Sequence, residues 1–282
     1  MPPTPRSMEL RELAQRVADG LPADVAQEIV LTGSTSRGVA DELSDVEMLV
    51  VSEQLPGVDE CAALARAAGL VDVETWTPPV TGAWSIGGRV DLTPVQLVWW
   101  SRAYVEERLR AILAAEIVDH LRLQTAEALA HGVTLRTSGG LAAWQDRLRV
   151  YPPELAAGVI EDAAEIWGGY PASSILTLTR PGERLQLVEH LLEDAVGVLR
   201  IVFALNRVWE PGRKRLAMRL EALAEKPPRL AERLESALVE PDARAALLGM
   251  TEIAADTIAL APSGRRVDRA RPWLAELTEL LR

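Results

Sequence analysis

Apolar residues near the N-terminus recur at helical spacing, and short apolar runs follow. Ser7 suits a helix N-cap, and the apolar positions after it are three or four residues apart. These positions are Leu10, Leu13, Val17 and Leu21. The pattern predicts an amphipathic helix over residues 7–20, with its apolar side against a core.

Between this helix and Pro94, short apolar runs bounded by turn residues predict strands. A helical segment at residues 60–68 and a turn-rich stretch at residues 78–88 separate them. The predicted strands are Ile29–Leu31, Asp45–Val51, Val71–Thr75 and Arg89–Leu92. This part of the chain therefore alternates between helix and strand.

Beyond Pro94 the strand pattern ends and long helical patterns take over. The predicted helices are Tyr104–Leu113, Ile117–Ala130, Pro153–Ile166, Arg184–Leu205 and Arg213–Ala224. The chain is thus predicted to be α+β, with a mixed N-terminal module at 1–116 and an all-α domain at 117–282.

The composition indicates a globular protein and excludes some other classes. Hydrophobic residues make up 48% and charged residues 25% of the 282 residues, as in globular proteins. With Cys61 as its single cysteine, the chain excludes an intrachain disulfide. Apolar runs are broken by charge before membrane-spanning length and residues 1–7 lack an apolar signal segment, so we expect a cytoplasmic protein without a membrane partner.

The net charge of -11 bears on the partner. A protein that binds a long nucleic acid must neutralise many phosphates, so we do not expect a nucleic-acid partner. An acidic surface attracts a cationic small molecule, although solubility alone also explains the charge. The sequence leaves open whether the chain forms a homodimer.

One segment, residues 33–51, contains residue types suited to phosphate and metal chemistry. Gly33 lets backbone amides approach an anion, Ser34 adds a hydroxyl donor, and Arg37 is a candidate phosphate ligand. Asp45 and Glu47 are two apart on a predicted strand, so their side chains share a face. Adjacent carboxylates of this kind suit magnesium that also binds substrate phosphates.

Asp91 is the third candidate carboxylate, within the predicted strand Arg89–Leu92. It would complete a metal site with Asp45 and Glu47, in which a pair of magnesium ions activates the attacking oxygen. The alternative is an acid at a strand edge or on a solvent-facing strand.

The Gly33-Ser34 pair, the ten-residue gap and the Asp45-Val46-Glu47 triplet resemble the nucleotidyltransferase superfamily with the polymerase-beta catalytic fold. Within it, Ser44 to Met48 is similar to the metal-binding strand of kanamycin-type aminoglycoside nucleotidyltransferases. The resemblance implies a small mixed sheet flanked by helices, with Mg²⁺ at Asp45, Glu47 and Asp91. It further implies an NTP, expected to be ATP, held by Gly33, Ser34 and Arg37.

The resemblance implies transfer of AMP to a hydroxyl of a small acceptor such as an aminoglycoside-like antibiotic, with release of pyrophosphate, and hence antibiotic resistance. Two alternatives remain. Relatives with this catalytic module modify proteins or tRNA as toxins, and a non-catalytic nucleotide-binding protein could retain the fold.

In aminoglycoside enzymes a glutamate of the helical domain acts as general base, so the resemblance makes Glu189 and Glu193 candidates for this role. The apolar stripe of this helix is predicted at Leu185, Val188, Leu192, Val196 and Leu199. Glu189 falls within its arc and Glu193 nearer its border. An ion pair with Arg184 or a neighbouring helix is an equal alternative for either glutamate.

Lys214 follows a Pro-Gly turn and is a candidate ligand for a nucleotide phosphate. The alternative places it with the nearby arginines on a solvated helix start.

Overall fold

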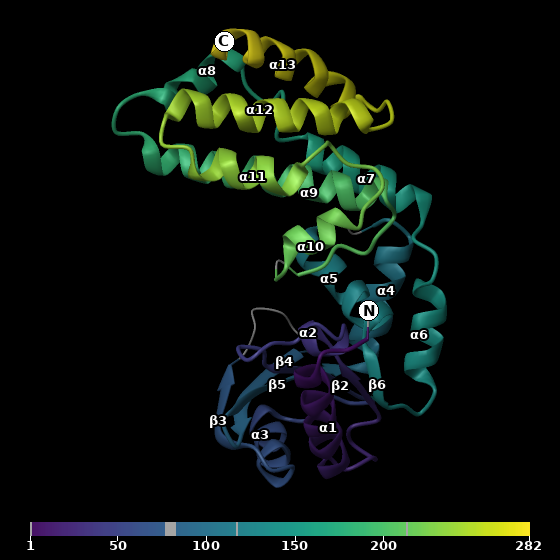
Figure 1. Ribbon diagram of the computed structural model, residues 1–282. Helices are drawn as coiled ribbons and strands as arrows, with labels where there is room; N and C mark the ends of the chain where they lie inside the picture. The colour runs from purple at the N-terminus through teal and green to yellow at the C-terminus, as the bar shows by residue number, and fades with distance from the viewer. Residues whose placement is uncertain (1, 77–82, 117, 213) are drawn as a thin grey trace. The chain divides into compact units, whose positions relative to one another are not determined.

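The computed structural model describes residues 2–76, 83–116, 118–212 and 214–282. The protein is α+β, with a mixed sheet and many helices (Figure 1). It forms two compact units. Unit 1 comprises Met1–Ile112 and Gln124–Val150, and unit 2 comprises Leu113–Leu123 and Tyr151–Arg282.

Unit 1 contains the sheet and the helices that flank it. Its helices are α1 (Pro5–Gly20), α2 (Gly33–Ser36), α3 (Val58–Ala67), α4 (Arg102–Leu113), α5 (His120–His131) and α6 (Gly140–Leu148). Its strands are β1 (Glu28–Leu31), β2 (Val46–Ser52), β3 (Val71–Trp76), β4 (Ala83–Val90), β5 (Thr93–Ser101) and β6 (Val133–Arg136). The ends of α4 and α5 extend into unit 2.

The sheet is mixed, in the strand order β3-β4-β5-β2-β1-β6. β2 pairs with β5 in parallel, whereas the other neighbours are antiparallel. The end of β1, the start of β2, the end of β4 and the start of β5 therefore lie along one edge of the sheet. The segments that carry Gly33, Asp45, Glu47 and Asp91 all lie at or near this edge.

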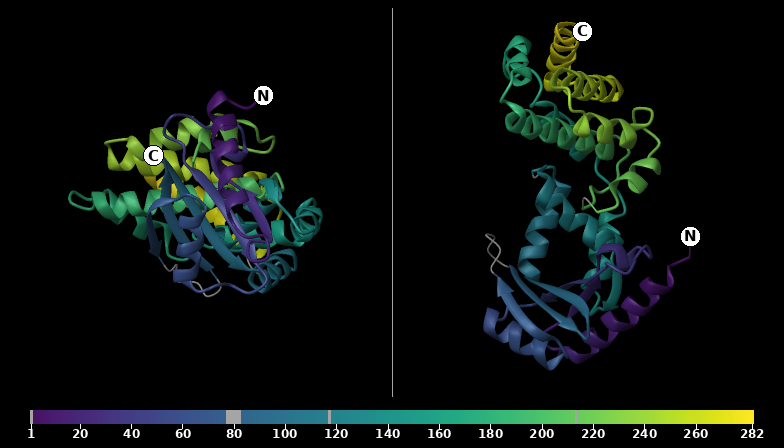
Figure 2. Two further views of the ribbon diagram at one scale, coloured as in Figure 1. Left: turned by 90° about the horizontal axis from the view of Figure 1, so that it is seen from below. Right: turned by 60° about the vertical axis from the view of Figure 1, so that its left-hand side comes forward.

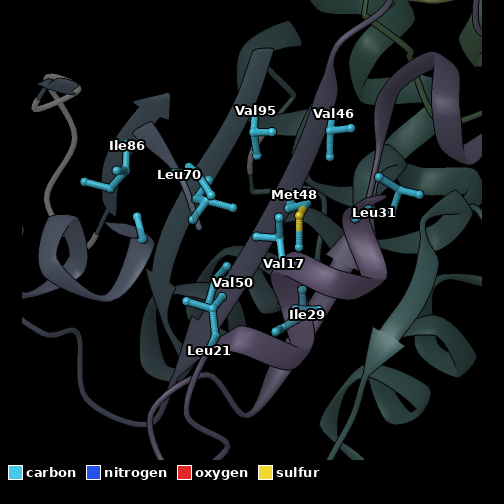
Figure 3. Close-up of a cluster of buried hydrophobic side chains, with 14 of the residues drawn as sticks. Val17, Leu21, Ile29, Leu31, Val46, Met48, Val50, Leu70, Ile86 and Val95 are labelled. Carbon is cyan, nitrogen blue, oxygen red and sulfur yellow. The ribbon is translucent and has the colours of Figure 1, made fainter. Parts of the chain in front are cut away.

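One face of the sheet packs against α1 and α3, which lie on the same side of it (Figure 2). Alternate residues of the strands point into this core, as the period of a strand requires. Val46, Met48 and Val50 of β2 lie beside Ile29 and Leu31 of β1 (Figure 3). The predicted apolar side of α1 is buried here as well.

The opposite face of β2 carries Glu47, Leu49 and Val51. On this side Val30 of β1 lies against the segment after α5, because a side chain on Gly132 would meet it. α6 contacts α4 through a hydrogen bond from Trp144 to Glu106, and it contacts α5 through hydrogen bonds of Gln145. These helices thus belong with the sheet.

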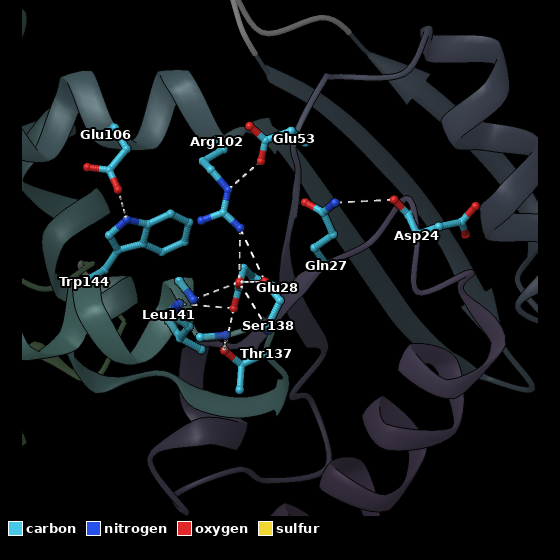
Figure 4. Close-up of polar contacts among 12 residues, drawn as sticks. Asp24, Gln27, Glu28, Glu53, Arg102, Glu106, Thr137, Ser138, Leu141 and Trp144 are labelled. Atoms are coloured by element: carbon cyan, nitrogen blue, oxygen red, sulfur yellow. Dashed lines mark hydrogen bonds and ion pairs between the residues drawn. The ribbon is translucent and has the colours of Figure 1, made fainter.

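Glu28 fastens α6 to the sheet (Figure 4). Its fully buried carboxylate accepts hydrogen bonds from the backbone N–H groups of Gly140 and Leu141, at 3.0 and 3.1 Å, and from both Thr137 and Ser138. An acid at the first turn of a helix satisfies donors that have no partner within the helix. Arg102 pairs with the same carboxylate at 3.2 Å.

Unit 2 is built from helices. They are α7 (Pro153–Ala164), α8 (Ala172–Ile175), the short 3₁₀ helix η1 (Leu176–Thr179), α9 (Arg184–Leu205), α10 (Leu216–Glu221), α11 (Leu230–Val239), α12 (Ala243–Leu260) and α13 (Arg265–Leu281). α9 packs against α7 and α12, and α13 packs against α12. Trp167 and Phe203 are among its largest buried side chains.

The predicted boundary near Glu116 differs from the observed division. Residues 124–150 return to unit 1 because β6 pairs with β1 and because Glu28 holds the start of α6. The pattern at 133–148 predicted neither element. No helix among the described residues has both the length and the apolar character needed to cross a membrane.

Other predicted elements shift at their ends. Residues 83–88, predicted as turn, form the first part of β4, whereas residues 78–82 lie outside the described residues. The helix predicted from Arg213 to Ala224 is only the short α10. Arg213 and Ile117, where two predicted helices begin, are also outside the described residues.

Candidate functional site

The turn after β1 is fastened to the start of β2, where Glu47 lies on the strand and Asp45 directly precedes it. Thr32 donates from its backbone N to the carbonyl oxygen of Glu47 at 2.8 Å. Thr35 Oγ1 donates to the carbonyl oxygen of Asp45 at 3.1 Å. These bonds hold α2, which begins at Gly33, beside the start of β2.

Position 33 does not tolerate a side chain, for two reasons. Its φ of +70° is in the left-handed region, which favours glycine. A Cβ built on it would lie 2.1 Å from Oε2 of Glu47, well inside contact distance. The carboxylate of Glu47 therefore occupies the space next to the turn.

A second layer of contacts fixes the end of α2. Arg11 of α1 donates from Nε to the carbonyl oxygen of Thr35 at 3.1 Å and from Nη2 to that of Ser36 at 2.6 Å. Ser36 Oγ donates to the carbonyl oxygen of Gly33 at 3.0 Å. Ser34, the predicted hydroxyl donor, is buried with 6% of its surface exposed. The turn is thus a rigid support for Glu47.

Arg37 lies at the end of α2 and makes an ion pair with Glu127 of α5, at 3.4 Å. Glu127 is buried, whereas about a quarter of the Arg37 side chain is exposed. A buried carboxylate requires such a partner, because an unpaired buried charge is costly. Arg37 therefore has a structural role whether or not it also binds phosphate.

The register of the sheet places Gln96 of β5 directly beside Glu47 of β2. Neighbours in register project from the same face of a sheet. Gln96 donates from Nε2 to Ser85 Oγ at 3.0 Å. The sequence pattern does not distinguish Gln96, because its position beside Glu47 depends on the parallel pairing of β2 with β5.

A shallow hollow adjoins this face at β3 and β4, with a volume of about 270 Å³. We call it the β4 hollow. Its lining includes Glu74, Gly87, Gly88, Arg89 and Pro94. Gly87 pairs with Gln96 in the sheet, so the β4 hollow lies next to the position of Gln96.

Asp91 is not part of the strand predicted for it. β4 ends at Val90 and β5 begins at Thr93, so Asp91 and Leu92 form the turn between them. Asp91 is exposed, with a φ of 52°. The described part of the chain holds no group of three or more His, Cys, Asp or Glu side chains that could bind a metal. The strand predicted for Asp91 is therefore wrong, whereas its role as a metal ligand stays a prediction.

Glu189 and Glu193 lie on α9 in unit 2, and both are exposed. The apolar stripe predicted around them is wrong, because Leu185, Leu192 and Val196 are exposed. The buried side of α9 contains instead Leu187, Leu191, Asp194, Ala195, Val198 and Val202. Both glutamates line a cavity together with residues of that unit.

Lys214 lies in unit 2, exposed in the turn before α10. Its predicted contact with phosphate is not tested by this position and remains a prediction.

The residues that the sequence did not indicate are Glu127 and Gln96, which are distant in sequence from Asp45 and Glu47. Neither belongs to a recognisable motif, and only the folded chain brings them to the site.

No protein-family model matches this chain, and no curated protein matches it. Among solved structures, the chain is similar to a nucleotidyltransferase-like protein from Exiguobacterium sibiricum 255-15, with 13% sequence identity and a TM-score of 0.41. The match covers 98% of this chain and 90% of that chain. Because both the identity and the TM-score are low, the function proposed below rests on the residues of this chain alone.

Proposed function

We propose that this protein is a magnesium-dependent nucleotidyltransferase that moves a nucleoside monophosphate from an NTP to a hydroxyl of a small acceptor. The observation that carries the proposal is the placement of the Glu47 carboxylate against the Gly33 turn, at the start of the strand that follows Asp45. The motif that resembles this family therefore forms one local structure. ATP is the proposed donor.

The donor set fits magnesium. Asp45 and Glu47 supply hard carboxylate oxygens, and both residues are partly accessible to solvent. Magnesium in phosphate-transferring sites is commonly held by one or two carboxylates together with substrate phosphates and water. Such a site needs no third protein carboxylate, which agrees with the position of Asp91. When bound, the ion would offset the charge of the phosphates.

The chain's own residues would position the substrate. Gly33 adds no side chain of its own beside a bound triphosphate, and Arg37 offers a cationic side chain in addition to its pair with Glu127. The acceptor oxygen would attack the α-phosphorus as the bond to pyrophosphate breaks. The hydroxyl proton must pass to a base as this oxygen attacks.

An aminoglycoside-like acceptor is the first to test, because an acidic protein attracts polycations. The protein would be incubated with Mg²⁺ and ATP labelled on the α-phosphate, together with kanamycin or a neutral sugar. The expected product is an acceptor whose mass has increased by one nucleoside monophosphate, with one pyrophosphate released for each transfer.

Asp45→Asn removes the charge of one proposed ligand at nearly constant volume, and Glu42→Gln is its control in the exposed loop before β2. Transfer should disappear in the first variant and persist in the second. Transfer that persists in Asp45→Asn would refute the proposal. Magnesium-dependent binding of ATP without transfer to any acceptor would favour the non-catalytic alternative instead.

A further inference from the structure

Unit 2 contains a cavity of about 550 Å³ beside α9, within the size range of small-molecule sites. We call it the α9 cavity. Its wall is formed by one side of α9, by α8 and η1, by the segment around Tyr170, and by Trp273 of α13. All of these residues belong to unit 2, so the cavity is complete within this unit.

The α9 side of the cavity is acidic. Glu189 and Glu193 are one helical turn apart, and neither has an ion-pair partner among the described residues. Like charges at this spacing repel one another on a helix. Glu165, which also lines the cavity, differs from them because Arg266 and Arg269 pair with it. The two α9 carboxylates are thus available to a cation.

A polar pair, Asp194 and His190, also lines the cavity. Asp194 is 3% exposed and lines the cavity, and its Oδ1 accepts a hydrogen bond from Trp167 Nε1 at 2.9 Å. Its Oδ2 lies 3.5 Å from His190 Nε2, and this buried nitrogen makes no hydrogen bond within the described chain. Buried polar atoms are normally satisfied, so this one indicates a position for a polar ligand group or water.

The remaining wall is largely apolar. Ile166, Ile175 and Leu178 line it, and so do the aromatic residues Tyr170 and Trp273. Tyr170 is 77% exposed although it is large and aromatic. Trp273 Nε1 donates to the carbonyl oxygen of Tyr170 at 2.6 Å, which fixes the two residues to each other. Aromatic rings bind apolar groups and also attract cations.

We propose that the α9 cavity binds an organic cation, an amine attached to an apolar body, with the amine at Glu189 and Glu193 and the body against Tyr170 and Trp273. An anion would be repelled by the α9 carboxylates, and a neutral ligand would leave their mutual repulsion unrelieved. This site is separate from the nucleotidyl transfer proposed for unit 1 and does not depend on it.

The test uses the full chain and a matched pair of probes, 4-phenylbutylamine and 4-phenylbutanol, with binding measured by calorimetry at neutral pH. The amine should bind saturably at one site, and at least about tenfold more tightly than the alcohol, since the two differ mainly in charge. Absence of saturable amine binding at millimolar concentration, or equal affinity for both probes, would overturn the proposal.

Three variants locate the binding. Glu189→Gln combined with Glu193→Gln should weaken amine binding at least about tenfold, whereas Glu235→Gln on α11, outside the cavity, should leave it unchanged. Gly169→Trp should block both probes, because Gly169 lines the cavity and a Cβ there meets no atom within 4 Å. Unchanged amine binding in the double variant or in Gly169→Trp would contradict the proposal.

The affinity for 4-phenylbutylamine should also be the same in Asp45→Asn as in the native chain. The two proposals can therefore fail independently, because loss of transfer says nothing about the amine site.

Discussion

The carboxylate of Glu47 fills the space that a side chain at position 33 would need. A Cβ on Gly33 would lie 2.1 Å from Glu47 Oε2, and the φ of Gly33 is +70°. Two independent costs therefore oppose any substitution at this position. They link the conformation of the turn to the position of the proposed metal ligand.

Gly33→Ala should lower the free energy of unfolding by about 2–4 kcal/mol, from backbone strain and from the displaced carboxylate. Denaturant unfolding measures the change. Gly69→Ala is the matched control, because Gly69 has a φ of +98° but no atom within 4 Å of its Cβ. That variant should show the backbone cost alone, about 1 kcal/mol.

The contact part of the cost should vanish when Glu47 is truncated. In a Glu47→Ala background, Gly33→Ala should cost about as much as Gly69→Ala does in the native chain. A strictly additive double variant would show that the two residues do not interact.

Gln96→Glu would place a carboxylate directly beside Glu47. Without metal, two like charges at this spacing should lower stability by about 0.2–1 kcal/mol. With metal, the added ligand should tighten Mn²⁺ binding severalfold, as measured by electron paramagnetic resonance of the free ion. Thr134→Glu, exposed on β6, adds the same charge as a control. Equal Mn²⁺ affinity in both variants would mean that no ion binds beside Glu47.

Glu28→Gln should destabilise the protein at neutral pH and less so in acid. Burial raises the pKa of Glu28, but hydrogen bonds from Ser138, Thr137 and the N–H groups of Leu141 and Gly140 outweigh it and lower the pKa below 4.5. The carboxylate therefore contributes stability above pH 4.5, and this contribution is lost as the pH falls through the folded-state pKa. Urea unfolding at a series of pH values measures the difference. A pH-independent difference would contradict this account.

Asp194→Asn should have the opposite effect. Burial raises the pKa of Asp194 to about 6, although His190 and the Trp167 hydrogen bond lower it. The charged form of Asp194 therefore destabilises the folded protein. This destabilisation is absent below pH 3.8 and reaches its full size above about pH 6. Asparagine retains an acceptor for Trp167, so the variant should melt at a higher temperature than the native protein at pH 8 but not at pH 3.5. A lower melting temperature at pH 8 would show that the charge is stabilising.

The sequence predicted the local structure of the segment that contains Gly33, Asp45 and Glu47. The apolar run at Ile29 and the Gly33 turn follow from nearby residues, and β1, β2 and α1 lie where the pattern places them. The predicted mixed sheet flanked by helices is confirmed.

The features that the sequence did not predict depend on distant contacts. β6 is only four residues long and exists because β1 offers it an edge. Val90-Asp91-Leu92 alternates like a strand, yet the pairing of Val90 with Thr93 makes Asp91 part of a turn. On α9, Leu192 and Val196 are exposed, so hydrophobicity alone indicated the wrong buried side.

The most direct test of the proposed function is the magnesium dependence of nucleotide binding. Calorimetry would compare the affinity for α,β-methylene-ATP with Mg²⁺ and with EDTA, in the native chain, Asp45→Asn and Glu42→Gln. We predict that Mg²⁺ tightens binding at least about tenfold in the native chain and in Glu42→Gln, and that Asp45→Asn abolishes this gain. Equal affinity with and without Mg²⁺ in the native chain, or an undiminished gain in Asp45→Asn, would contradict the assignment.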